Sequence, residues 1–354
     1  MPAFLQLPVT LLALATAVPE IELPQQEAKE LARRLFGRRT AQFERMEPVF
    51  DNAGIAKRHI VRPSLWYEGD HGWAERNRVY VEAAEALFEQ AARAALDRAE
   101  VHPAAIDAVV TVSTTGIATP SLEARVAGRM GFRNDVERVP IFGLGCAGGV
   151  SGLATAARLA ASEPGRTVLF VTVELCSISI RLDNPSKANI VATALFGDGA
   201  AACVLRSGEG GVAALGSGSQ ILWPETLRIM GWDVEDPGLG VVFDRAIPPF
   251  VAEHMAKGVR QIVRTSGHSA EDIHRFTCHP GGAKVIAALE SSLALGQGAL
   301  DHERAVLRDY GNMSAPTVLF VLERLMSERL PDRSLLLALG PGFTASGLVV
   351  ERPA

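Results

Sequence analysis

Hydrophobic residues along the chain fall into short runs that alternate with longer amphipathic stretches. Residues 9–18 (VTLLALATAV), 106–114 (IDAVVTVST) and 166–175 (RTVLFVTVEL) are apolar and rich in β-branched side chains, which predicts strands. The last run has almost no polar position, as expected of a strand that is covered on both faces. Residues 79–99 are rich in alanine and glutamate, and this composition predicts a long helix.

The same alternation continues to the C-terminus. The expected units are a strand at 136–142 with a glycine turn and a helix reaching residue 161, a strand at 201–206, a strand, turn and helix at 276–295, a turn and helix at 310–326, and two strands within 334–351. A glycine-rich stretch at 207–219 is expected to be a connection. The pattern predicts a layered α/β fold of two similar halves, residues 1–215 and 216–354.

Composition excludes several classes of protein. The 354 residues are 48% apolar and carry a net charge of −5 with no basic stripe, which argues against a nucleic-acid-binding protein. The apolar run at 9–18 is about half the length of a membrane span, and no Lys or Arg precedes it as a signal peptide would require. Four cysteines lack C-x-x-C spacing, so neither a metal site nor a disulfide framework is expected. We expect a cytoplasmic protein that does not bind a membrane.

The stretch GLGCAGG allows two interpretations. Gly143, Gly145 and Gly148 form a G-x-G-x-x-G between an apolar run and a helix, which is typical of a dinucleotide-binding turn, with Glu174 as the acid for the ribose. The alternative centres on Cys146, which falls in the first turn of the predicted helix. Unpaired N–H groups and the helix dipole favour a thiolate there, and a thiolate is a nucleophile.

Two further turns favour the cysteine interpretation. His279 ends an apolar strand in CHPGG, and Asn312 lies in YGNMSAP before a helix. A dinucleotide site gives neither residue a role. A cysteine, a histidine and an asparagine at three strand–turn–helix junctions are instead the parts of a nucleophilic site, since the imidazole can activate the thiol and the amide can donate to a developing oxyanion.

Five motifs, GLGCAGG, ALFGDGAAA, HPGG, YGNMSAPTVLFVLE and LGPGFTA, together resemble the type III polyketide synthases, the chalcone-synthase-like branch of the thiolase-fold condensing enzymes. The resemblance implies a thiolase-like αβαβα fold and a homodimer that uses acyl-CoA and malonyl-CoA without a dissociable cofactor. It also implies that Cys146 is the acylated nucleophile and that His279 and Asn312 bind the thioester carbonyl.

Further residues are assigned by the same resemblance. Phe196 matches the aromatic gate between the coenzyme A tunnel and the cavity, and Phe243 matches a second cavity aromatic. The remaining expected cavity residues are Thr114, Thr115, Thr119, Cys176, Ser179, Trp232, Ser314 and Gly342. The expected coenzyme A contacts are Lys57, Arg58, Gly281 and Gly282.

The resemblance also bears on the starter. Cys176 and Ser179 replace threonines of plant chalcone-forming enzymes, which disfavours a cinnamoyl-type starter. The segment MGWDVEDPGLGVVFDRAIP is similar to bacterial members that take long fatty-acyl starters and form alkylpyrones or alkylresorcinols.

Two alternatives stay open at this point. A β-ketoacyl synthase that initiates fatty-acid synthesis also uses Cys, His and Asn, but it has a different residue after the histidine and a more glycine-rich final turn. A catalytically silent family member would act as a binding partner, and the intact Cys146, His279 and Asn312 argue against it. Release of CO2 from malonyl-CoA separates a silent member from both enzymes.

Overall fold

The computed structural model describes residues 7–37, 40, 42–181 and 183–353. Its strands are β1 (Val9–Ala17), β2 (Ile21–Pro24), β3 (Lys57–Ile60), β4 (Ala108–Val112), β5 (Glu137–Ile141), β6 (Thr167–Leu175), β7 (Asp198–Ser207), β8 (Ala213–Leu222), β9 (Met230–Glu235), β10 (Gly238–Phe243), β11 (Arg275–Cys278), β12 (Arg333–Gly340) and β13 (Thr344–Glu351). Its α-helices are α1 (Gln25–Phe36), α2 (Phe43–Met46), α3 (Pro48–Asp51), α4 (Trp73–Arg98), α5 (Leu122–Met130), α6 (Gly148–Ala160), α7 (Lys187–Leu195), α8 (Ile247–Thr265), α9 (Ala283–Ser292), α10 (Asp301–Tyr310) and α11 (Thr317–Glu328).

A nine-stranded mixed sheet in the order β11-β12-β13-β8-β1-β7-β6-β4-β5 runs through both halves of the chain. β4 pairs in parallel with β5 and β6, and β11 pairs in parallel with β12. The neighbouring pairs in the centre of the sheet are all antiparallel: β12 with β13, β13 with β8, β8 with β1, β1 with β7, and β7 with β6. All nine residues of β6 are buried, which confirms the prediction of a strand covered on both faces.

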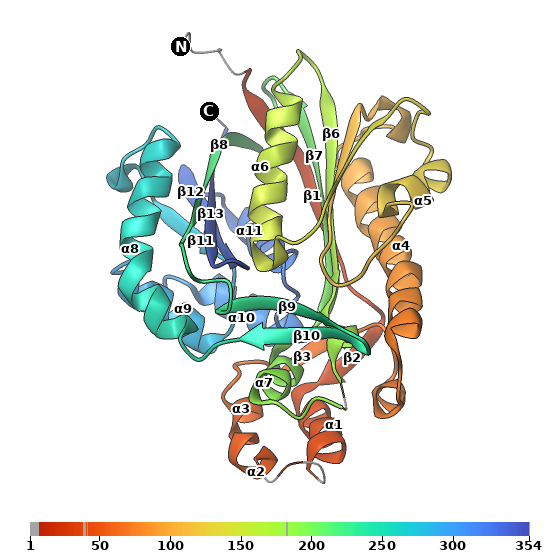
Figure 1. The fold of residues 1–354 in the computed structure, drawn as a ribbon. Helices are drawn as coiled ribbons and strands as arrows, with labels where there is room; N and C mark the ends of the chain where they lie inside the picture. Colours follow the sequence, from red (N-terminus) through yellow and green to blue (C-terminus); the bar gives the residue numbers. More distant parts are fainter. Residues whose placement is uncertain (1–6, 38–39, 41, 182, 354) are drawn as a thin grey trace.

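Helices and sheet form the expected layers (Figure 1). Helices α6 and α11 lie between the two halves of the sheet, where their apolar residues share one core with β1, β4, β6 and β12. Helix α4 covers the outer face of the N-terminal half, and α8 with α9 covers the outer face of the C-terminal half. This arrangement confirms the predicted layered α/β architecture.

The glycine-rich stretch at 207–219 corrects one prediction. From Ala213 it is part of β8, which pairs with β1 and β13 in the middle of the sheet. Its glycines fit because neighbours approach closely: a Cβ added at Gly218 would lie 2.4 Å from the Cβ of Ala154 on α6. Close packing against a helix therefore explains the glycine at position 218, whereas Gly208 and Gly210, with φ of +122° and +93°, lie in the short connection between β7 and β8.

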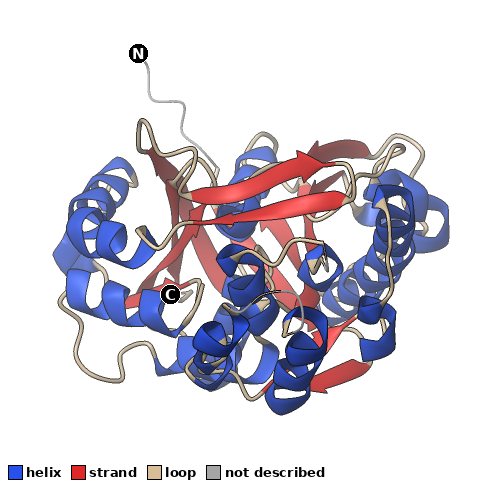
Figure 2. Ribbon diagram, turned by 60° about the horizontal axis from the view of Figure 1, so that its bottom comes forward, coloured by secondary structure: helices blue, strands red, loops and turns tan. Residues whose placement is uncertain are grey.

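A two-stranded hairpin outside the main sheet was not predicted from the sequence. β9 and β10 form an antiparallel hairpin that lies across the molecule apart from the nine strands (Figures 1 and 2). Its Trp232, Val241 and Phe243 pack against a buried cluster of Cys176, Ala192 and Phe196. The hairpin therefore covers one side of the region in which the predicted site lies.

In the part of the chain that the structure describes, no helix is long and apolar enough to span a bilayer.

Candidate active site

Cys146 lies in a single 3-10 turn, Gly145–Ala147, between β5 and the first residue of α6. Gly145 has a φ of +48°, and a Cβ there would lie 2.7 Å from the Cδ of Pro341, so the turn requires glycine. The Cys146 side chain is only 8% exposed. The turn is thus built to present the thiol inside the protein, at the start of a helix, as the sequence predicts.

Burial acts against the thiolate that the sequence predicts at Cys146. Burial raises the pKa of the thiol to about 12, although a hydrogen bond with the Ser314 side chain acts in the opposite direction. Removal of the sulfur from water disfavours its charged form. The isolated thiol is therefore protonated at neutral pH, and the nucleophile needs a base.

His279 follows the last residue of β11, and its backbone N–H donates to the Leu337 carbonyl oxygen at 2.7 Å. The imidazole is 5% exposed, and neither ring nitrogen has a hydrogen-bond partner among the described residues. Burial lowers the pKa of His279 to about 3. A neutral imidazole with two unengaged nitrogens can accept a proton at one of them and donate a hydrogen bond from the other.

Asn312 follows α10 and is 1% exposed. Its side-chain Nδ2 donates to the Gly281 carbonyl oxygen at 3.1 Å, and its Oδ1 accepts from the Ser314 backbone N–H at 2.8 Å. These two bonds fix the plane of the amide. One N–H of Nδ2 remains for a substrate, because an amide nitrogen carries two hydrogens.

A continuous series of contacts connects the three residues. The turn that carries Cys146 lies against the turn that carries Ser314, because a Cβ added at Gly149 would lie 2.2 Å from the Ala315 carbonyl oxygen, and the Ser314 backbone N–H donates to Asn312. Asn312 in turn donates to Gly281, and a Cβ added at Gly281 would lie 3.7 Å from Nε2 of His279. Residues from three distant segments therefore meet where β11, the turn after β5 and the turn before α11 come together.

Glu174 decides the alternative interpretation of the glycine motif. Its carboxylate, at the end of β6, accepts hydrogen bonds from the backbone N–H groups of Thr114 and Thr115 at 3.0–3.1 Å and from the Thr115 hydroxyl at 2.8 Å. Burial raises its pKa to about 7 against the effect of these bonds. The acid is enclosed and engaged, so it is not available to a ribose. The Thr114 hydroxyl in turn accepts from the Gly145 N–H at 3.2 Å, which links Glu174 to the cysteine turn.

The aromatic residues predicted to line the cavity do lie together. The Phe196 ring centroid is 5.8 Å from that of Trp232 and 5.6 Å from that of Phe243. Cys176 is fully buried in the same cluster. The backbone of Phe196 forms a β-bridge with Asn312. The aromatic cluster is therefore next to the candidate catalytic residues.

Other predicted cavity residues divide into two groups. Thr115 and Ser179 line one small pocket, at the N-terminal end of α4, and the Ser314 side chain lowers the pKa of the Cys146 thiol against the larger effect of burial. Gly342 lies in the turn between β12 and β13, one residue after the Pro341 that contacts Gly145. Thr119 is different, because it is exposed on the surface of the chain. Its predicted place in the cavity stays a prediction.

The predicted coenzyme A contacts also divide. Lys57 is half-buried and forms a 2.6 Å ion pair with Glu22 on the neighbouring strand β2, and Gly281 and Gly282 follow His279. Arg58 is 1% exposed, and its guanidinium donates to backbone carbonyl oxygens at the end of α7. It cannot meet a phosphate from this position. The prediction for Arg58 is wrong because alternate residues of β3 face opposite sides, and Arg58 faces the interior.

Asp198 is a residue that sequence reasoning missed. Its carboxylate accepts from the Ser177 N–H at 2.7 Å, the Ser177 hydroxyl at 2.5 Å and the Val61 N–H at 2.9 Å. Burial raises its pKa to about 7. The sequence did carry a signal, since an aspartate inside the apolar, glycine-rich stretch ALFGDGAAAC has no solvent to face and requires buried partners.

Comparisons with known proteins agree with this site. The family models "Chalcone and stilbene synthases, N-terminal domain" and "C-terminal domain" match residues 5–209 and 214–352. The chain is 40% identical over 347 residues to 1,3,6,8-tetrahydroxynaphthalene synthase of Streptomyces peucetius subsp. caesius, which covers 96% of this chain and 92% of the relative. It is 35% identical over 355 residues to a putative chalcone synthase of Bacillus subtilis (strain 168), covering 96% and 97%.

A solved structure gives the same result. The crystal structure of 1,3,6,8-tetrahydroxynaphthalene synthase from Streptomyces coelicolor A3(2), a bacterial type III polyketide synthase, superposes with a TM-score of 0.92 at 31% identity and covers 98% of this chain and 99% of the other. These matches decide against the β-ketoacyl synthase alternative. With both halves matched and the fold shared, the chain belongs to the chalcone and stilbene synthase family and is a type III polyketide synthase of thiolase-like fold, an acyltransferase that catalyses decarboxylative Claisen condensation of coenzyme A thioesters.

Proposed function

We propose that Cys146, His279 and Asn312 are the catalytic residues, and that the enzyme extends a long-chain fatty-acyl starter with malonyl-CoA before closing a pyrone or resorcinol ring. The observation that carries the catalytic assignment is the series of contacts from the turn that carries Cys146, packed against Ala315, through Ser314 and Asn312 to the turn after His279.

The loading step begins with two neutral groups. The Cys146 thiol passes its proton to a ring nitrogen of His279 as the sulfur attacks the thioester carbonyl of the acyl-CoA. The carbon–sulfur bond to coenzyme A breaks, and the departing thiolate takes the proton back from the imidazolium. The raised pKa of the thiol and the lowered pKa of the imidazole support this order, because burial disfavours either charge alone and permits the two opposite charges together.

Condensation uses the two donors. Loss of CO2 from malonyl-CoA leaves its electron pair as an enolate, whose oxygen accepts from an N–H of His279 and the unengaged N–H of Asn312. The enolate carbon attacks the acyl carbonyl on Cys146, and the cysteine thiolate leaves to accept the extended chain for another round. Donors fixed before charge develops stabilise the transition state selectively, by about 3 kcal/mol for each donor.

The aliphatic starter is supported by the state of the hydroxyl groups among the predicted cavity residues. The hydroxyls of Thr114 and Thr115 bond to Gly145 and Glu174, and the Ser179 hydroxyl donates to the Cys176 carbonyl oxygen at 2.6 Å. These groups are satisfied within the protein. A wall whose polar atoms are already paired favours an alkyl chain over a hydroxylated acyl group.

A second candidate is formation of 1,3,6,8-tetrahydroxynaphthalene, the product in the names of relatives that are 40% and 32% identical. This product has no alkyl chain, so it needs no fatty-acyl starter. Purified enzyme is given malonyl-CoA alone and malonyl-CoA with acyl-CoAs from acetyl to palmitoyl, and the products are identified by mass spectrometry. Alkyl-substituted rings with the longer acyl-CoAs support the proposal, whereas a naphthalene from malonyl-CoA alone replaces it. The homodimer stays a family-based proposal, to be measured by light scattering.

A further inference from the structure

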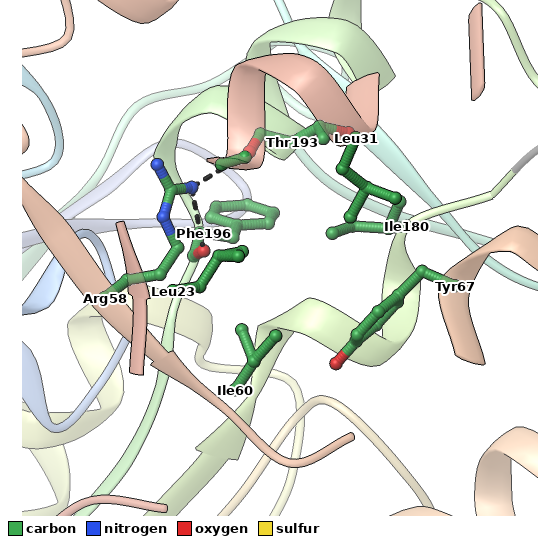
Figure 3. A pocket seen from close by; sticks show the side chains of 9 residues that line it. Leu23, Leu31, Arg58, Ile60, Tyr67, Ile180, Thr193 and Phe196 are labelled. Atoms are coloured by element: carbon green, nitrogen blue, oxygen red, sulfur yellow. Dashed lines mark hydrogen bonds between the residues drawn. The ribbon is translucent and has the colours of Figure 1, made fainter. Parts of the chain in front are cut away.

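Arg58 lies beneath the carboxyl end of α7 with its charge enclosed by protein. Its Nη1 donates to the carbonyl oxygens of Thr193 at 2.9 Å and Phe196 at 3.2 Å, and its Nη2 donates to that of Ala194 at 2.9 Å. Figure 3 shows the guanidinium directed at this backbone, with the bonds to Thr193 and Phe196 drawn. Carbonyls in the last turn of a helix have no partner within the helix, and one side chain here satisfies three of these carbonyls.

The charge of Arg58 has a counterpart two residues beyond Phe196. Asp198 interacts electrostatically with Arg58 and is itself held by Ser177 and Val61. Burial lowers the pKa of Arg58 to about 9, so the guanidinium remains protonated at neutral pH. The backbone of Phe196 is thus fixed on one side by a buried cation and on the other by a strand that begins with a buried acid.

The Phe196 ring, in contrast, has room beside it. Phe196 forms part of the wall of a small pocket together with Leu23, Leu31, Ile60 and Ile180, and the space is on the order of one water molecule (Figure 3). On another side the ring meets Trp232 and Phe243. The two aromatic rings hold Phe196 on one side only, so its position also depends on its backbone, which Arg58 binds.

We propose that Arg58 is a positioning residue, which fixes the Phe196 ring through the carboxyl end of α7 and thereby sets the length of acyl chain that the enzyme accepts. This proposal rests on the proposed role of Phe196 between the coenzyme A tunnel and the cavity. It assigns to Arg58 a function in selectivity in place of contact with coenzyme A.

A double-mutant cycle tests the proposal. The ratio of kcat/KM for decanoyl-CoA to kcat/KM for hexanoyl-CoA is measured in the wild type, Arg58→Met, Phe196→Ala and the double variant. Arg58→Met is expected to change this ratio by on the order of tenfold, since misplacing one wall of an acyl pocket has effects of this size. In the Phe196→Ala background the ring through which Arg58 acts is missing, so the same substitution is expected to change the ratio by less than about twofold. A change of that size is within the margin to which the effects of independent substitutions add.

Controls separate positioning from general destabilisation. Arg166→Met removes another largely buried arginine, paired with Glu137 and Glu163 before the first residue of β6, at the opposite end of that strand from the site. It should lower the melting temperature and leave the ratio unchanged. If Arg58→Met does not fold, Arg58→Lys takes its place in the cycle, because lysine keeps the charge but cannot span three carbonyls in a fixed fork.

Equal changes in both backgrounds, or an unchanged ratio in the Arg58 variant, would overturn the proposal. Failure of the proposed function gives a different result, because wild-type enzyme would then form no acyl adduct on Cys146 with either thioester.

Discussion

Replacing His279 by alanine isolates the buried thiol from its base. The pKa of the Cys146 thiol set by burial is about 12, against about 8.5 for a free cysteine. At pH 8 the thiolate fraction in His279→Ala is then about one in ten thousand, compared with roughly a quarter for a free cysteine. A more basic thiolate is also intrinsically more nucleophilic, with a Brønsted coefficient of about 0.4–0.5, which recovers roughly one and a half orders of magnitude. The net expectation is alkylation about two orders of magnitude slower than for a free cysteine.

The assay is the rate of iodoacetamide labelling between pH 6 and 10, read on the peptide that contains Cys146. In His279→Ala the rate should rise about tenfold per pH unit without levelling off, because only the small thiolate fraction reacts. The wild type should react faster throughout the neutral range, since the imidazole can hold the proton. His254→Ala, which removes a half-buried imidazole on α8 outside the candidate site, is the matched control and should behave as the wild type. Identical curves for the wild type and His279→Ala, or a plateau below pH 9 in the variant, would refute the reasoning.

Three further substitutions test the site and its frame. Asn312→Ala removes one donor to the enolate oxygen and should slow release of CO2 from malonyl-CoA by about 10²–10³-fold; release at the wild-type rate would remove the amide from the mechanism. Gly149→Ala places a Cβ 2.2 Å from the Ala315 carbonyl oxygen and should lower the free energy of unfolding, measured in urea, by about 1–3 kcal/mol. An unchanged urea midpoint would mean that α6 and the turn before α11 separate easily. Cys176→Phe should shorten the products seen by mass spectrometry, and products of unchanged length would show that residue 176 does not line the cavity.

The layered fold and the meeting of the three polar turns could be predicted from the sequence because both depend on local patterns. An apolar run such as β6 and a glycine turn such as 143–149 can be recognised from the sequence. The turns that follow such strands are then expected to meet, because strand ends lie along one edge of a sheet. The glycines of β8 could not be assigned in this way. Whether a glycine serves a turn or a close contact depends on the partner, here Ala154 on α6, which lies far away in the sequence.

The assignments that failed involve the direction of a side chain or its solvation. Arg58 and Lys57 are adjacent, and only the pairing of β3 with β2 decides which of them faces the interior. Position at a helix start suggested a thiolate at Cys146, and the degree of burial, which no local pattern specifies, acts against it by raising the pKa. The division at 215/216 stays a prediction.

Peptide mapping of the acylated enzyme tests the central claim most directly. The protein is incubated with decanoyl-CoA and malonyl-CoA, quenched in acid and digested. The masses of the peptides that carry Cys146, Cys176, Cys203 and Cys278 are then measured by mass spectrometry. The account predicts acyl groups on the Cys146 peptide alone, as a series that grows by successive malonyl-derived two-carbon units. Acylation of another cysteine in the wild type, or product formation by the Cys146→Ala variant, would contradict it.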